Sequence, residues 1–161
     1  GGSTFHFSAS FWTPQPDAFP GLPDPARQDG DGPRLTILLV EDERINRVTA
    51  LRMLRNMGHT VEEAENGQEA LHKLNSAAFD LVLMDIQMPV MDGLTATKLI
   101  RNGELPGVDR DIPVIALTAY ATRQDTVRFL RQGLSGFVPK PFNIHDLRQA
   151  IAQVSSARPG R

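Results

Sequence analysis

Residues 81–93 read Leu-Val-Leu-Met-Asp-Ile-Gln-Met-Pro-Val-Met-Asp-Gly. The first four residues are all apolar, which is typical of a strand buried on both faces of a parallel sheet. Asp85 follows this run directly. Asp92 and Gly93 form a turn that we interpret as structural, and residues 94–100 then have the apolar spacing of a helix. A buried strand that leads into a helix in this way indicates an α/β protein.

The same alternation of strand and helix extends in both directions from this stretch. Strands are predicted over residues 35–40, 60–64, 81–84, 112–117 and 136–138. Helices are predicted over residues 45–57, 67–74, 94–100, 122–132 and 144–154. Five strands alternating with five helices predict a doubly wound α/β fold, in which helices cover both faces of a parallel sheet. In such sheets the functional site lies at the carboxyl ends of the strands.

Length, charge and composition exclude several classes of protein. The 161 residues suit one domain with an additional segment, and the absence of cysteine excludes disulfides, thiolate zinc sites and thiol catalysis. A formal net charge of −2 gives no support to a nucleic-acid-binding domain. No apolar run approaches the ~18 residues of a membrane span, and no secretory signal is visible. We therefore expect a cytoplasmic domain without membrane contact.

The composition changes sharply along the chain. Half of the 12 prolines lie within residues 14–33, among glycines and aspartates. Such a stretch buries too little apolar surface to offset the entropy of ordering it, and dense proline favours an extended linker. We therefore predict a linker over residues 10–33, a folded domain over 34–156 and a tail over 157–161.

Polar residues follow four of the five predicted strands. Glu41 and Asp42 come after the first, Asp85 after the third, Thr118 after the fourth, and Lys140 after the fifth. Clustered carboxylates favour a hard divalent cation such as Mg²⁺. Aspartate carboxylates form acyl-phosphates, and a lysine and a hydroxyl can bind the other phosphoryl oxygens. The set therefore predicts phosphoryl transfer onto Asp85.

Four sequence blocks in order carry a family resemblance. They are Val40-Glu41-Asp42-Glu43, Met84 to Gly93, Ala116-Leu117-Thr118-Ala119 and Val138-Pro139-Lys140-Pro141-Phe142. Together they resemble the receiver (response-regulator) domain of two-component signalling over residues 35–155. The resemblance implies a flavodoxin-like (βα)5 three-layer sandwich with the parallel strand order 2-1-3-4-5.

The resemblance also implies roles for individual residues around a magnesium ion. Asp85 resembles the phosphoacceptor. Asp42 resembles the carboxylate that binds Mg²⁺ directly, and Glu41 the one that holds it partly through water. Gln87 would contribute its backbone carbonyl to the metal.

A second set of implied roles concerns switching and the lifetime of the phosphoryl group. Thr118 resembles the hydroxyl that shifts toward the phosphoryl group, and Phe137 the aromatic residue that follows it. The bond between Lys140 and Pro141 resembles one that is often cis. Gln87 and Tyr120 stand at positions that modulate hydrolysis; for Tyr120, shielding of the phosphoryl group and contact with a partner are both open.

The amino-terminal residues have a resemblance of their own. Gly-Gly-Ser-Thr-Phe-His-Phe at residues 1–7 resembles the end of a histidine-kinase ATP-binding domain, so residues 1–9 are interpreted as a remnant of its last strand. The alternative for Gly1 to Ser3 is a cloning remnant. The kinase interpretation makes this fragment the carboxyl-terminal part of a hybrid histidine kinase, a parent protein that is free to carry a membrane anchor. The fragment has no ATP site of its own, and whether it should be called an enzyme is left open.

The implied partners are the dimerisation and catalytic domains of the parent kinase, with a histidine phosphotransfer domain as a further candidate. Two other functions compete with a phosphoacceptor. An aspartate-nucleophile phosphatase of the haloacid-dehalogenase type needs a second acid two residues after the nucleophile, where this chain has Gln87. The other competing function is that of a pseudo-receiver, which binds partners without being phosphorylated.

The histidines lack metal-ligand spacing, and we predict that His6, His59, His72 and His145 lie at the surface or in a tail.

Overall fold

The structure is a computed structural model that describes residues 33–119 and 123–156. Its strands are β1 (Thr36–Val40), β2 (Thr60–Ala64), β3 (Leu81–Asp85), β4 (Val114–Thr118) and β5 (Gly136–Pro139). Its helices are α1 (Arg44–Asn56), α2 (Gly67–Ser76), α3 (Gly93–Asn102), α4 (Arg123–Arg131) and α5 (Ile144–Ser156). The predicted kinase remnant, the tail, Tyr120, His6 and the linker up to residue 32 lie outside the described residues.

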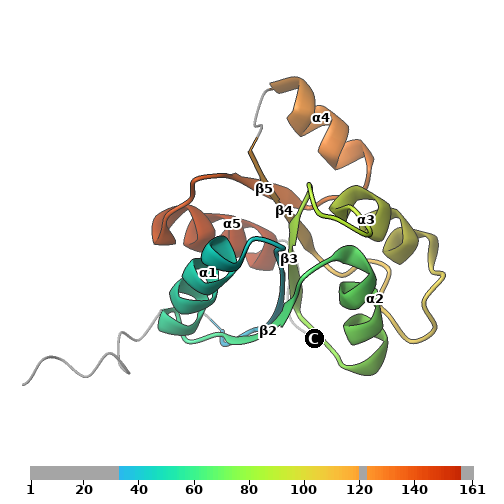
Figure 1. Cartoon of the computed structure of the whole chain (residues 1–161), viewed down its shortest axis with the longest axis horizontal. Helices are drawn as coiled ribbons and strands as arrows, with labels where there is room; N and C mark the ends of the chain where they lie inside the picture. Colours follow the sequence, from blue (N-terminus) through green and yellow to red (C-terminus); the bar gives the residue numbers. More distant parts are fainter. Residues whose placement is uncertain (1–32, 120–122, 157–161) are drawn as a thin grey trace, which may run out of the picture.

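The five strands form one parallel sheet in the order β2-β1-β3-β4-β5. Side chains alternate between its two faces, as the period of a strand requires. Ile37 and Leu39 pack in a core with α1 and α5, whereas Leu38 and Val40 pack in a second core with α2, α3 and Phe129 of α4. Figure 1 shows α1 and α5 together on one side of the sheet and α2 and α3 on the other. The predicted flavodoxin-like sandwich and its strand order are confirmed.

The register brings the carboxyl ends of the strands to one edge. Val40 of β1 is paired with Ala64 of β2 and with Met84 of β3. Thr118 at the end of β4 is paired with Pro139 at the end of β5. The residues that follow β1, β3, β4 and β5 are therefore neighbours in space, although they are far apart in sequence.

Two element boundaries differ from the prediction for local reasons. The fourth strand begins at Val114 instead of Ile112, because the Ile112 amide donates to Asp109 in a turn (3.0 Å) and Pro113 has no amide hydrogen. Helix α3 begins at Gly93, because the Asp92 carboxylate accepts the Thr95 amide at 2.8 Å and caps the helix. The structural role predicted for Asp92 is confirmed.

The apolar spacing that predicts α1 coincides with the buried face of the helix only in its second half. Ala50 and Leu54 are fully buried, but Ile45 and Val48 are 73% and 53% exposed. These two residues lie in the first half of the helix, which begins directly after the acidic residues Glu41 to Glu43 that follow β1. Within the described ranges, none of the helices is both long and apolar enough to cross a membrane.

The prediction for the histidines is wrong at His59. This residue is partly buried between α1 and β2, and its Nδ1 accepts a hydrogen bond from the Leu35 amide at 3.3 Å. Burial lowers the pKa of His59 below its ordinary value. His72 and His145 are exposed, as predicted.

Candidate functional site

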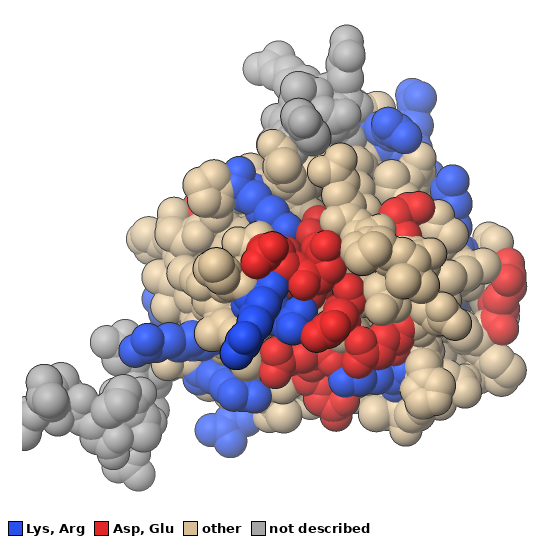
Figure 2. Space-filling view, viewed as in Figure 1, with Lys and Arg blue, Asp and Glu red and all other residues tan. Residues whose placement is uncertain are grey.

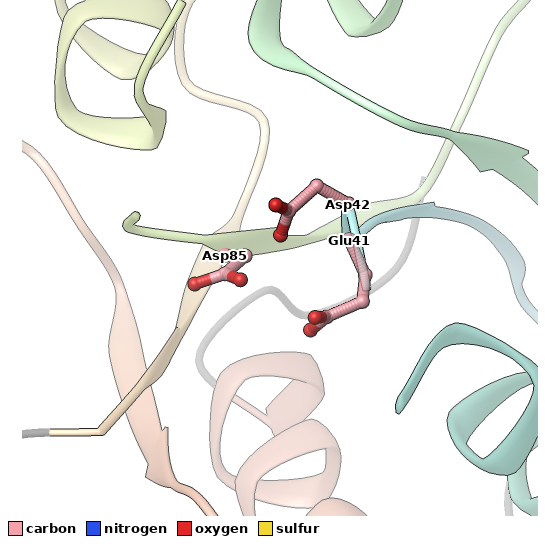
Figure 3. A group of neighbouring side chains, drawn as sticks. All are labelled: Glu41, Asp42 and Asp85. Carbon is pink, nitrogen blue, oxygen red and sulfur yellow. The ribbon is translucent and has the colours of Figure 1, made fainter. Parts of the chain in front are cut away.

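Three carboxylates meet at the carboxyl ends of β1 and β3. Glu41, Asp42 and Asp85 each offer an oxygen atom, and these atoms lie within 4.8 Å of one another. Figure 3 shows the three side chains extending to the same side of the strand ends. Glu41 is fully buried and Asp85 nearly so, whereas Asp42 is exposed. In Figure 2, acidic side chains gather in the middle of the visible face, with basic side chains beside them.

Lys140 joins two of these acids from the end of β5. Its Nζ donates to Asp85 Oδ2 at 2.7 Å and lies 2.6 Å from Glu41 Oε2. The Lys140 amide donates to the Thr118 carbonyl at 2.7 Å, so β4 holds the backbone of this residue. The bond between Lys140 and Pro141 is cis, as predicted.

The electrostatics of the site reflect burial of charge. Burial raises the pKa of Glu41 and the charge of Asp85 adds to this, while the contact with Lys140 opposes both. Burial lowers the pKa of Lys140, but its contacts with Asp85 and Glu41 outweigh burial and hold that pKa above its ordinary value. Lys140 therefore stays cationic and partly compensates the acids.

The donor set fits a hard divalent cation. Glu41 Oε2 is buried, and its one close cationic partner among the described residues is Lys140 Nζ at 2.6 Å, which also contacts Asp85. One lysine shared by two buried carboxylates compensates their charge only in part, and a bound cation would offset more of the desolvation cost. Carboxylate oxygens are ligands that Mg²⁺ prefers. Glu41, Asp42 and Asp85 would hold it; the carbonyl of Gln87 as a ligand stays a prediction.

The loop after β3 holds Asp85 through backbone contacts. The Gln87 amide donates to Asp85 Oδ1 at 3.1 Å, and the Ile86 amide donates to the Leu117 carbonyl at 3.1 Å. Gly93 lies so close that an added Cβ would come 2.1 Å from the Asp85 carbonyl oxygen. The sequence indicates Gly93 only as part of a turn; its close approach to Asp85 is a tertiary contact that spacing alone does not show.

The predicted switch residues lie on neighbouring strands at this edge. Thr118 is buried at the end of β4. Phe137 is partly buried against the core that contains α2 and α3, and its register partner is Ala116 rather than Thr118. The structure thus places Thr118 at the edge where the site lies and Phe137 inside the neighbouring strand, and their switching roles stay predictions.

Two residues of α1 that the sequence reasoning missed hold Glu41 in place. Asn46 Nδ2 donates to Glu41 Oε1 at 3.3 Å. Arg47 donates from one terminal nitrogen to the carbonyl oxygens of Glu41 (2.8 Å) and Asp42 (3.2 Å). Side chains in a helix point toward its amino terminus. A basic residue in the early turns of a helix that follows an acidic segment is therefore the signal that could have found Arg47.

Known proteins with similar sequences and structures place the chain in a family. Residues 37–152 match the response regulator receiver domain. Histidine kinase 5 of Arabidopsis thaliana is 38% identical over 140 residues, which cover 73% of this chain and 15% of that protein. The chain thus spans a small part of this curated relative.

Two solved structures extend the comparison. The receiver domain of the sensor histidine kinase PA1611 from Pseudomonas aeruginosa, which has a magnesium ion coordinated in its active-site cleft, is 35% identical with a TM-score of 0.66 over 76% of this chain and 99% of that one. The second is a co-crystal structure from Saccharomyces cerevisiae that contains the histidine phosphotransfer protein Ypd1 and the receiver domain of Ssk1. It matches with 31% identity and a TM-score of 0.67, over 74% of this chain and 88% of the matched chain. The fold, the acid set and these matches agree, and the chain belongs to the response regulator receiver domain family of two-component phosphorelays.

Proposed function

We propose that Asp85 accepts a phosphoryl group from a phosphohistidine, with Mg²⁺ held by Glu41, Asp42 and Asp85. The observation that carries this proposal is the position of Lys140, whose Nζ is 2.7 Å from Asp85 Oδ2 and 2.6 Å from Glu41 Oε2. A cation that contacts both the acceptor and a buried metal-site carboxylate is placed to meet the charge of an incoming phosphoryl group. Bound Mg²⁺ would supply further neutralisation of the phosphoryl oxygens.

In this transfer a carboxylate oxygen of Asp85 attacks the phosphorus. The phosphorus–nitrogen bond of the phosphohistidine breaks, and its electron pair remains on the imidazole nitrogen. Lys140 exchanges its contact with free Asp85 for one with the phosphoryl group. The Thr118 hydroxyl, at the end of the neighbouring strand, contacts another phosphoryl oxygen.

Phosphorylation then changes the surface formed by α4, β5 and α5. The phosphoryl group adds charge at Asp85. Thr118 moves toward it, and Phe137 takes up the space that Thr118 leaves on the β4–β5 side of the sheet. Gln87 and Tyr120, which stand at sequence positions that modulate hydrolysis, set how readily water reaches the acyl-phosphate.

The partner reaches Asp85 over the exposed apolar start of α1. Ile45 and Val48 lie one turn apart on this helix, directly after the acidic segment that carries Glu41 and Asp42. Apolar side chains on the surface beside a charged site are typical of a protein interface. A histidine phosphotransfer domain is the partner type supported by the similar Ssk1 receiver domain, which was crystallised with Ypd1.

The whole protein is proposed to be a hybrid histidine kinase with this domain in the cytoplasm. Its relative Histidine kinase 5 supports this reading, since the matched region covers only 15% of that protein. The phosphoryl donor would then be the kinase part of the same protein or a separate phosphotransfer domain.

The proposed acceptor is tested by the intact mass of the chain after incubation with acetyl phosphate and Mg²⁺. We expect one phosphoryl adduct that requires Mg²⁺ and disappears in Asp85→Asn. Asp80→Asn is the matched control, because Asp80 directly precedes the opposite end of β3 and asparagine keeps the acceptor oxygen that holds the Thr36 amide (2.7 Å). A folded wild-type chain that binds Mg²⁺ but is never phosphorylated would favour the pseudo-receiver instead.

A further inference from the structure

Arg47 is the one side chain described above that contacts the backbone of both amino-terminal acids of the site. One terminal nitrogen donates to the carbonyl oxygens of Glu41 (2.8 Å) and Asp42 (3.2 Å), so it binds the two residues on either side of one peptide bond. The orientation of that backbone determines where both carboxylates point. A fixed backbone at this point therefore sets the relative positions of the buried Glu41 carboxylate and the exposed Asp42 carboxylate.

Two carboxylates hold the other edge of the guanidinium. Its second terminal nitrogen lies 2.7 Å from Glu65 Oε1, and its Nε lies 3.5 Å from Glu63 Oε2. Glu63 belongs to β2, and Glu65 directly follows it. The Glu65 amide is itself bound by Glu69 Oε2 of α2 at 2.9 Å. Arg47 therefore ties the segment after β1 to the segment after β2 and, through Glu65, to α2.

Only an arginine has the donors for this arrangement. A guanidinium presents five N–H groups in a planar fork, whereas a lysine ammonium is a single point charge. The Arg47 side chain is 12% exposed, although its partner Glu65 is 64% exposed. Placing a positive charge early in a helix is unfavourable for the helix dipole, so the stability of α1 does not explain this residue.

Charge and positioning predict opposite effects of Arg47 on a bound cation. The positive charge of Arg47 next to the acids repels Mg²⁺. Removing this charge also leaves the negative charges of Glu63 and Glu65 uncompensated, which favours a cation nearby. On electrostatic grounds alone, a neutral residue at position 47 would therefore tighten Mg²⁺ binding. If the guanidinium instead holds the ligands in place, the same change weakens binding.

We propose that Arg47 is a positioning residue for the metal site: it holds the backbone of Glu41 and Asp42 so that their carboxylates are ready for Mg²⁺. This inference rests on the proposed metal site and adds a residue to it. Residues that orient metal ligands typically change metal affinity by about 10- to 100-fold when they are replaced. We expect the lower end of that range, because Asn46 still contacts the Glu41 side chain.

The test is calorimetric titration of the whole chain with Mg²⁺, for the wild type, Arg47→Gln and Arg47→Lys. Arg52→Gln is the matched control, since Arg52 is an exposed arginine of the same helix. The dissociation constant should rise about tenfold in Arg47→Gln. It should also rise in Arg47→Lys, which keeps the charge but loses the fork, and stay unchanged in Arg52→Gln. Circular dichroism confirms that each variant is folded.

A second measurement separates positioning from general damage. Phosphorylation by acetyl phosphate is followed as the Mg²⁺ concentration is raised. Arg47→Gln should need about tenfold more Mg²⁺ than the wild type to reach half of its maximal phosphorylation rate. At saturating Mg²⁺ its phosphorylation rate should approach that of the wild type. Unchanged or tighter Mg²⁺ binding in folded Arg47→Gln, or wild-type behaviour of Arg47→Lys, would overturn the inference. A wild-type chain that binds no Mg²⁺ would instead refute the proposed metal site itself, and the inference with it.

Discussion

Gly93 packs against the backbone of Asp85 so closely that a Cβ at position 93 would lie 2.1 Å from the Asp85 carbonyl oxygen. The Gly93 amide also donates to the Ile86 carbonyl at 3.1 Å, which returns the loop to the end of β3. The start of α3 and the proposed acceptor are thereby in direct contact. The glycine is needed for this approach and not for an unusual backbone angle.

Gly93→Ala should therefore destabilise the fold and disturb Asp85 together. Because the clash is with backbone, we expect a loss of about 1–3 kcal/mol, as for overpacking in a core. Urea unfolding measures it. Gly136→Ala is the control, because a Cβ there would meet its nearest atom at an ordinary 3.8 Å. Equal stability of the two variants would contradict the prediction.

Mg²⁺ should stabilise the chain through Asp42. A ligand that binds only the folded state adds about 2.7 kcal/mol at 100 times its dissociation constant. Asp42 is exposed, so Asp42→Asn should leave the metal-free stability within about 0.5 kcal/mol of the wild type. Thermal unfolding with Mg²⁺ and with EDTA should show that this variant loses the Mg²⁺-dependent increase, whereas Glu62→Gln on β2 retains it.

His59 makes the stability depend on pH in a defined direction. Burial lowers the pKa of His59 below its ordinary value of 6.5, and its Nδ1 must be unprotonated to accept the Leu35 amide. The unfolded chain therefore takes up a proton at higher pH than the folded one. Its contribution to stability is complete above pH 6.5 and is lost as the pH falls from there toward the folded pKa.

Urea unfolding between pH 7.5 and pH 5 tests this relationship. His59→Asn keeps an acceptor atom but cannot be protonated, so its stability should fall less on acidification than that of the wild type. His72→Asn removes an exposed histidine and should keep the wild-type slope. The prediction fails if His59→Asn and the wild type lose stability in parallel.

Asp92 should behave as a charged helix cap. Its carboxylate accepts the Thr95 amide and hydroxyl, both at 2.8 Å. Burial alone would raise the pKa of Asp92, but these hydrogen bonds outweigh it and lower the pKa. Asp92→Ala should cost about 1 kcal/mol. The contribution of the charged Asp92 carboxylate to stability is present above its pKa in the unfolded chain and is lost as the pH falls through its pKa in the folded chain. Asp92→Asn should therefore retain most of the stability without this acid dependence.

The apolar start of α1 should matter for a protein donor and not for a small one. Ile45→Asp and Val48→Asp place a charge where we propose that a phosphotransfer domain docks, and should slow transfer from it about tenfold. Phosphorylation by acetyl phosphate should be unchanged. Val127→Asp, which alters a similarly exposed residue on α4, is the control for both donors. Slower reaction with acetyl phosphate would show damage to the site instead of to docking.

The order of strands and helices could be predicted from the sequence because each element carries its own local pattern. Four apolar residues before Asp85 predict a strand buried on both faces, and that strand is observed with all five residues buried. Glu41, Asp42 and Asp85 could be grouped because parallel strands end at one edge of a sheet. The structural role of Asp92 could also be predicted, because the turn and the helix cap that it forms depend on residues close in sequence.

Tertiary structure alone decided which neighbouring residues are buried and what holds them. Glu41 and Asp42 are adjacent and chemically alike, but one is buried against Lys140 and the other is exposed. Ile45 and Val48 share the spacing of the buried residues of α1 and yet face outward. The contacts of Arg47 with β2, and of Gly93 with Asp85, join segments whose distance depends on how helices pack on the sheet. Local patterns determine elements, whereas burial and contact depend on packing between them.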